Sequence, residues 1–340
     1  MSQSLAVRDP VGRPAAAHEP VAALDPRRML QLALGALWLL DGMLQFQPAM
    51  FGKSFPQMLA GGAPGNPALV ARPISWSAAF IGHHVVVLNA IFAAIQLLLG
   101  LGIAWRPTVR LALAGSVLWS LAVWWLGEGL GGVLAGTASP VDGAPGAVVL
   151  YGLLAVLLWP ADRDPADRAP ADRAPADRAP ADRAPADREP AAPFVAARAV
   201  GRRIAQASWL AVWLGLAVLA LLPASRAIGR AIADTTPGEP AWLAWIDTHA
   251  ASALTRHGLL AAIVLAAAFV IVAVGTFLPR RPARAAIILA VVVAAVLWLA
   301  QGLGGMLTGS ATDPNTGPLL ALLALAFWPL SAPARSAGET

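Results

Sequence analysis

Eight apolar stretches dominate the chain and predict membrane-crossing helices. A helix rises about 1.5 Å per residue, so about 20 largely apolar residues are needed to cross roughly 30 Å of hydrocarbon. The stretches lack the strict apolar and polar alternation of an outer-membrane barrel, and isolated strands would leave backbone groups unpaired in lipid. The predicted spans are residues 29–47, 78–104, 108–126, 144–159, 204–222, 258–278, 285–300 and 318–328. We therefore expect an all-α integral membrane protein with eight transmembrane helices.

Basic residues in the short loops predict the orientation of these helices, because cytoplasmic loops carry an excess of Lys and Arg. With the N-terminus in the cytoplasm, the inner side receives Arg27, Arg28, Arg106, Arg110, Arg202, Arg203, Arg280, Arg281, Arg284 and Arg335. The outer side receives Lys53, Arg72, Arg226, Arg230 and Arg256. Eight spans then place both termini in the cytoplasm, and we expect the protein in the plasma membrane.

A repeated Pro-Ala-Asp-Arg-Ala sequence separates the first four spans from the last four. Proline at every fifth position prevents a continuous helix, and the alternating charges keep the segment soluble. The expected organisation is a cytoplasmic tail (1–28), a first four-helix unit (29–160), an extended cytoplasmic linker (161–203), a second four-helix unit (204–330) and a cytoplasmic tail (331–340).

The two units resemble each other when the first is shifted by 173 positions, which is the spacing of His84 and His257. Residues 64–68 (PGNPA) then fall on 237–241 (PGEPA), and residues 126–132 (LGEGLGG) fall on 299–305 (LAQGLGG). Such a register indicates an internal duplication. Because each unit has an even number of spans, the two units should be parallel copies related by an axis along the membrane normal.

The amino-acid composition excludes several kinds of chemistry. The chain is 58% hydrophobic and 13% charged, and it contains no cysteine, which excludes disulfides, thiolate metal sites and thiol redox chemistry. The net charge of +5 comes from arginines in loops, tails and the linker, so it predicts topology and a lipid bilayer as partner, with no nucleic acid. No hydrolytic triad, phosphate-binding loop or zinc spacing occurs. The sequence assigns neither a cofactor nor a metal, and it leaves open whether the protein is an enzyme.

Ionisable residues inside predicted spans are candidates for function, because burying a charge in hydrocarbon is costly. His84 and His257 occupy matching outer positions and are expected to face one another across the axis between the units. They would hydrogen-bond within their own units, contact a proton or substrate, or ligate haem or copper. Asp41 is a candidate buried acid in the first span that has no counterpart in the fifth.

The end of the third span in each unit is the other candidate region. Glu128 falls on Gln301, which keeps hydrogen bonding but removes the charge from one copy. A desolvated Glu128 would exchange a proton near neutral pH, whereas a solvated one would simply mark the lipid boundary. The glycines that follow permit close helix packing or a non-helical turn, and they are Gly129, Gly131, Gly132, Gly302, Gly304 and Gly305.

The first span contains LWLLDG at residues 37–42, and together with the tandem four-span units it resembles the DoxX-like superfamily of membrane proteins. The motifs APGNPA (63–68), IQLLLGLGIAWRP (95–107) and WWLGEGLGGVL (124–134) are similar to those of actinobacterial multi-pass proteins of that kind. The resemblance implies a four-helix fold and, in some members, quinone-linked or sulfur-compound oxidation. The thiol chemistry of those members does not carry over to a chain without cysteine.

Three functions are consistent with these features. The first is a DoxX-like protein with an outer-face site for a small apolar or quinone-like molecule, supporting a redox or envelope process. The second is a proton-coupled transporter of a small solute, in which Glu128 or Asp41 carries the proton. The third is a non-catalytic scaffold that binds another membrane protein.

Overall fold

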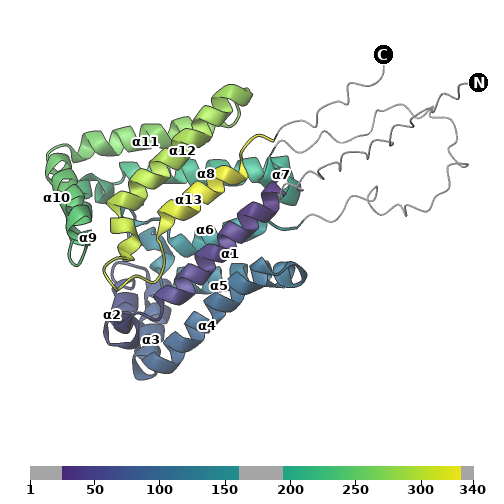
Figure 1. Cartoon of the computed structure of the whole chain (residues 1–340). Helices are drawn as coiled ribbons and strands as arrows, with labels where there is room; N and C mark the ends of the chain where they lie inside the picture. Colours follow the sequence, from purple (N-terminus) through teal and green to yellow (C-terminus); the bar gives the residue numbers. More distant parts are fainter. Residues whose placement is uncertain (1–24, 161–193, 331–340) are drawn as a thin grey trace, which may run out of the picture.

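The computed structural model describes residues 25–160 and 194–330, and within those ranges the chain forms helices and loops without a strand (Figure 1). Both predicted tails lie largely outside the described residues, as does the repeat-bearing part of the predicted linker. The prediction of an all-α protein is confirmed for the part of the chain that is described.

Five helical segments of the described chain are long and apolar enough to cross a membrane. They are α4 (Val85–Ala104), α5 (Val109–Leu126) with the preceding turn η2 (Arg106–Thr108), α8 (Arg202–Leu221), α11 (Gly258–Gly275) and α12 (Arg280–Ala300). A membrane protein is thus confirmed at this level. The other predicted spans coincide with α1 (Pro26–Leu44) and with two shorter apolar helices, α6 (Ala147–Leu157) and α13 (Thr316–Ala326).

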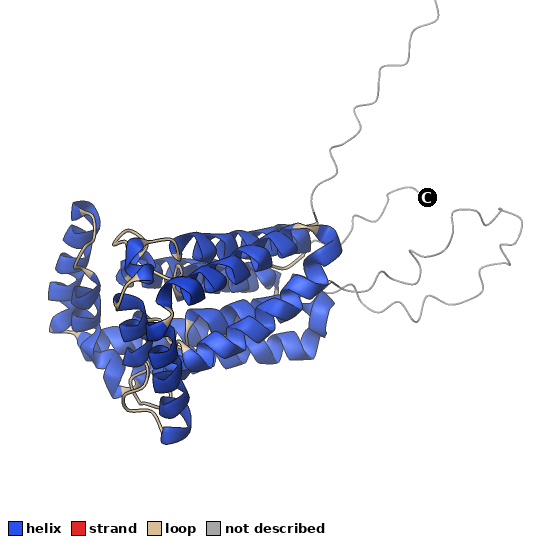
Figure 2. Cartoon of the chain, turned by 90° about the horizontal axis from the view of Figure 1, so that it is seen from below, coloured by secondary structure: helices blue, strands red, loops and turns tan. Residues whose placement is uncertain are grey.

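Shorter helices gather at one end of the long ones (Figures 1 and 2). They are α2 (Ser54–Gly61), α3 (Ala68–His83), α9 (Ile228–Thr235) and α10 (Ala241–Thr255), with the turns η1 (Pro48–Phe51), η3 (Gly129–Gly132), η4 (Pro140–Asp142), η7 (Pro223–Ala227) and η8 (Gly302–Gly305). The start of α1 and the end of α13 lie at the opposite end of the molecule (Figure 1). The loops that carry the Glu128 and Gln301 motifs therefore share one end with the short helices.

The predicted second span, residues 78–104, is wrong in its first turns, because the helix breaks at His84. His84 has φ −134° and ψ 30°, which separates α3 from α4. His257 has φ −122° and ψ 22°, and it separates α10 from α11 in the same way. The apolar residues continue on both sides of the break, so the sequence predicts one helix there. Average hydropathy does not change at a single non-helical residue.

Several elements recur at the expected spacing. The helices α3 and α10 start 173 residues apart, as do α4 and α11, and so do the turns η3 and η8. Both turns contain a leucine in the left-handed region, Leu130 at φ 57° and ψ 34° and Leu303 at φ 53° and ψ 33°. Packing recurs too: α1 packs on α4 and α5 on α6, while α8 packs on α11 and α12 on α13.

The chain after the repeat segment returns to the core earlier than the predicted linker boundary at residue 203. Residues Val195–Val200 form α7, which packs against α6 and α8. Phe194 stacks on Phe327 with ring centroids 4.8 Å apart, and Val195 is 1% exposed. The physical reason is burial of this short apolar segment, which the neighbouring arginines and prolines obscure in the sequence.

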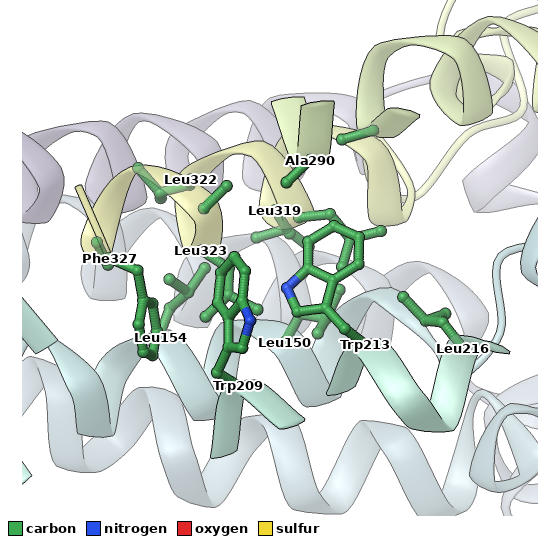
Figure 3. Close-up of a cluster of buried hydrophobic side chains, with 14 of the residues drawn as sticks. Leu150, Leu154, Trp209, Trp213, Leu216, Ala290, Leu319, Leu322, Leu323 and Phe327 are labelled. Carbon is green, nitrogen blue, oxygen red and sulfur yellow. The ribbon is translucent and has the colours of Figure 1, made fainter. Parts of the chain in front are cut away.

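The main core joins the two units. Trp209 and Trp213 of α8 point between Leu150 and Leu154 of α6 and the leucines of α13 (Figure 3). Both tryptophans are fully buried, and Trp209 donates a hydrogen bond to the carbonyl of Ala273 at 3.2 Å. The corresponding helices α6 and α13 also pack against one another. The two units therefore form one continuous hydrophobic core.

Candidate functional site

Two adjacent cavities lie in the first unit and at its border with the second. We call the first the aromatic chamber; it measures about 450 Å³ and is lined by Phe55, Trp76, Phe80, Phe92 and Trp119 among other residues of α1 to α5. We call the second the polar vestibule; it measures about 350 Å³ and is lined by loop residues that include Asn66, Ser139, Asp142 and Asn315. The residues common to both linings are Glu128 and Asp313. These two carboxyl groups therefore form the boundary between an apolar and a polar space.

Glu128 follows the end of α5 and reaches across to the start of α6. Its Oε1 accepts a hydrogen bond from the backbone N–H of Val148 at 3.2 Å, while its Oε2 is buried and has no partner among the described residues. Burial, and after it the negative charge of the neighbouring Asp313, raise the pKa of Glu128 to about 8. Glu128 thus caps the start of α6 with one carboxyl oxygen, and its other oxygen has no hydrogen-bond partner in the described structure. With a pKa of about 8, the carboxyl group is mostly protonated at neutral pH.

Asp313 comes from the second unit, in the loop before α13. The backbone N–H of Asn315 donates to its Oδ1 at 2.7 Å, and the Thr312 hydroxyl donates to its Oδ2 at 2.9 Å. Burial nevertheless raises its pKa. Because Glu128 belongs to the first unit, the boundary between the cavities requires both units.

Asp41 on α1 lines the aromatic chamber and is 1% exposed. Its Oδ1 has no hydrogen-bond partner in the described structure. One turn earlier, Trp38 packs on Tyr151 with ring centroids 4.2 Å apart and donates to the Ser116 hydroxyl at 2.9 Å. This buried contact fixes the part of α1 that presents Asp41. We call Asp41, Glu128 and Asp313 the carboxyl cluster; neither cavity is lined by a described Lys or Arg.

Gln301 is the counterpart of Glu128 and is fully engaged. Its Nε2 donates to the carbonyl of Pro140 and to the Thr316 hydroxyl, both at 3.0 Å. Gln301 is 3% exposed and bridges the start of α13 to the first unit. The structure therefore places Gln301 as a capping and docking residue, whereas its acidic counterpart keeps an unpaired oxygen beside a cavity.

The structure does not bring His84 and His257 together, so the expectation that they face one another is wrong. Both are exposed, and the α3–α4 and α10–α11 junctions that contain them lie on different sides of the molecule (Figure 1). The units meet through α6 and α13, which leaves α4 and α11 on the flanks. His84 contacts the ring of Phe80 at 5.4 Å between centroids, but neither histidine lines the chamber or the vestibule.

The predicted glycine motif forms a non-helical turn in both units. Gly129, Gly131, Gly132, Gly302, Gly304 and Gly305 all have positive φ. A Cβ on Gly131 would lie 2.1 Å from the Pro145 carbonyl oxygen, and one on Gly304 would lie 2.7 Å from that of Pro314. Glycine is required at both positions because the chain entering the last helix of each unit passes directly over the turn.

Sequence reasoning missed Asp313 and the aromatic walls. Thr312-Asp313-Pro314-Asn315 has the signature of a turn in which an aspartate binds the backbone two residues later, so the turn was recognisable. Asp313 lines both cavities together with Glu128 of the other unit, and this placement depends on how the units dock. The described residues contain no group of three or more His, Asp or Glu side chains placed to hold a metal ion.

Comparison of the chain with family models, with curated proteins and with solved structures gives no match. The resemblance to the DoxX-like superfamily therefore stays a prediction.

Proposed function

We propose that this protein is a proton-coupled transporter that binds a small amphipathic molecule in the aromatic chamber. The observation that carries the proposal is the carboxyl cluster, in which buried oxygens of Asp41 and Glu128 lack hydrogen-bond partners among residues 25–160 and 194–330, and both residues line a cavity large enough for a ligand. Unpaired buried carboxyl groups are costly, and they are retained where they bind or exchange something.

We also propose the topology in which this transporter works: eight spans, made by tandem duplication of a DoxX-like four-helix unit, in the plasma membrane with both termini cytoplasmic. The helix break at the histidine, the glycine turn and the pattern of helix packing all occur in both units, which supports duplication. At about 1.5 Å per residue, α6 and α13 are short for a full span. They are central helices flanked by longer ones, so their loops complete the crossing inside protein rather than in lipid.

Proton coupling follows from the position of Glu128 between the two cavities. In the empty protein Glu128 is neutral, because ionisation would place a charge in a poorly solvated site. An occupant that is itself neutral favours the protonated form, so its binding should weaken as pH rises through about 8, the pKa of Glu128. Glutamine at this position cannot titrate and should remove the dependence.

The test uses 2-naphthylmethanol, a neutral amphipathic probe, with purified protein in nanodiscs and empty nanodiscs as background. Energy transfer from the chamber tryptophans reports binding. The wild type should lose affinity from neutral to alkaline pH, and Glu128→Gln should bind equally at both. Asp234→Asn is the matched control, since Asp234 is an exposed acid that lines neither cavity. Wild-type binding that is flat across this pH range, or absent, contradicts the proposal.

A quinone-like occupant is the second candidate, because Trp119 offers one specific contact. Trp119 lines the chamber, and its Nε1 is buried without a partner in the described structure. An indole N–H donates to a quinone carbonyl, and Phe92 at 5.4 Å from Trp119 provides an apolar surface for the ring. Organic extraction of the purified protein, followed by an absorbance spectrum, would reveal a co-purified quinone and favour the redox function.

A further inference from the structure

We infer that the natural occupant of the aromatic chamber is a lipophilic organic cation with an aromatic or apolar body, which enters in exchange for a proton. This inference names the substrate class of the proposed transporter and therefore rests on that proposal. It is carried by the polarity of the unpaired atoms, the composition of the walls and the connection between the two cavities.

The unpaired atoms that line the chamber are mostly oxygens. The orphaned oxygens belong to Asp41, Gln45, Gln96 and Glu128, whereas the orphaned nitrogen is that of Trp119. Asp41 is 1% exposed and Gln96 is 8% exposed, so bulk water does not satisfy them. Amide oxygens without donors, beside carboxyl groups that become negative when they release their protons, favour a positively charged ligand over an anionic one.

The walls favour an organic cation over an inorganic one. The rings of Phe55 and Phe92 meet edge to face with centroids 6.2 Å apart, and those of Trp76 and Phe80 stack with centroids 5.5 Å apart, so ring surfaces line the space. Aromatic faces attract quaternary ammonium groups, whereas a small metal ion needs several oxygen ligands at close range. The described residues hold no cluster suited to a metal ion.

Charge balance identifies the exchanged partner. A neutral carboxyl group that meets a monovalent cation releases one proton and becomes the carboxylate that pairs with it, which leaves the net charge of the site unchanged. The proton leaves through the vestibule, whose wall includes Glu128, Asp313 and Asp142. The titratable groups that line the chamber are Asp41 from α1, Asp313 from the loop before α13, and Glu128 itself; Tyr151 from α6 lies buried beside Asp41.

The inference predicts selectivity by charge among probes that share one body. The probes are (2-naphthylmethyl)trimethylammonium, 2-naphthylmethanol and 2-naphthylacetate, tested on the wild-type protein in nanodiscs. The cation should bind most tightly, with affinity rising up to about tenfold per pH unit below the Glu128 pKa of about 8. The neutral probe should show the opposite trend, and the anion should not bind. Calorimetry in two buffers of different ionisation enthalpy should show about one proton released per cation bound.

Variants locate the effect. Asp41→Asn and Asp313→Asn should each weaken cation binding at least tenfold, while Asp234→Asn, an exposed acid of α9 outside both cavities, should leave it unchanged. The comparison of the three probes uses the wild-type protein alone. It therefore still tests the inference if one of the variants fails to fold.

The outcomes separate this inference from the proposed function. If the neutral probe or the anion binds more tightly than the cation, or if cation binding releases no proton, the cation inference is wrong. The transporter proposal then survives only if neutral-probe binding keeps its pH dependence. If no probe shows pH-dependent binding, both are wrong.

Discussion

Glu128 and Gln301 follow equivalent helices of the two units, but their side chains differ in how many polar atoms are hydrogen-bonded. Gln301 uses its amide to join Pro140 and Thr316, so it satisfies its polar groups within the protein. Glu128 caps α6 through one oxygen and keeps the other buried beside the vestibule. The substitution of an acid for an amide at one of two matched positions is therefore the residue-scale difference on which the proposed chemistry depends.

The stability of the protein should depend on pH through Glu128. A carboxyl group whose pKa is raised by folding stabilises the folded state while it is protonated, and this contribution is lost as pH rises. The window runs from the ordinary value of 4.5 to about 8. The free energy of unfolding should therefore fall across this range, and Glu128→Gln should reduce the fall by an amount on the order of 5 kcal/mol at alkaline pH. Thermal unfolding at several pH values measures it. The Asp234→Asn protein serves as the control and should retain the full dependence.

At the scale of elements, hydropathy predicted the long helices but not their interruptions. All predicted spans contain a helix, because about 20 apolar residues leave little alternative in lipid. The break at His84 and the early return of the chain at Phe194 depend on single residues and on tertiary burial, neither of which alters average hydropathy. The repeat register did anticipate that the glycine motif forms the same local structure twice.

The glycine turn offers a matched pair of substitutions. Gly131 and Gly136 both have positive φ, 64° and 72°, but a Cβ at Gly131 meets the Pro145 carbonyl whereas Gly136 faces open space. Gly131→Ala should destabilise the protein by more than about 3 kcal/mol, and Gly136→Ala by only about 1 kcal/mol, the cost of the left-handed backbone alone. Equal losses in thermal unfolding would show that the close approach at Gly131 does not constrain the turn.

At the scale of the whole molecule, the carboxyl cluster exists because two units dock. Asp41 and Glu128 belong to the first unit and Asp313 to the second, and the bond from Gln301 to Pro140 crosses the same border. The sequence predicted the units and two of these acids. It could not predict the cluster, since the expected pairing of His84 with His257 assumed that the units meet through other helices.

The proposed orientation can be tested directly because the chain has no cysteine of its own. Thr137→Cys lies on the exposed turn beside the vestibule, and Arg281→Cys is exposed at the start of α12, at the other end of that long helix from Gln301. A membrane-impermeant maleimide added to intact cells should label the first variant and not the second. Both should react in permeabilised cells. The reverse pattern would invert the topology and place the vestibule on the cytoplasmic side.

The central claim is that the carboxyl cluster holds an exchangeable proton beside the ligand. Infrared difference spectroscopy measures this directly, because a protonated carboxyl group has a carbonyl band that ionised carboxylates lack. Addition of (2-naphthylmethyl)trimethylammonium at neutral pH should remove that band in the wild type, and the change should be absent in Glu128→Gln. A wild-type protein without a protonated-carboxyl band at neutral pH, or with a band that the bound cation leaves intact, would contradict the account.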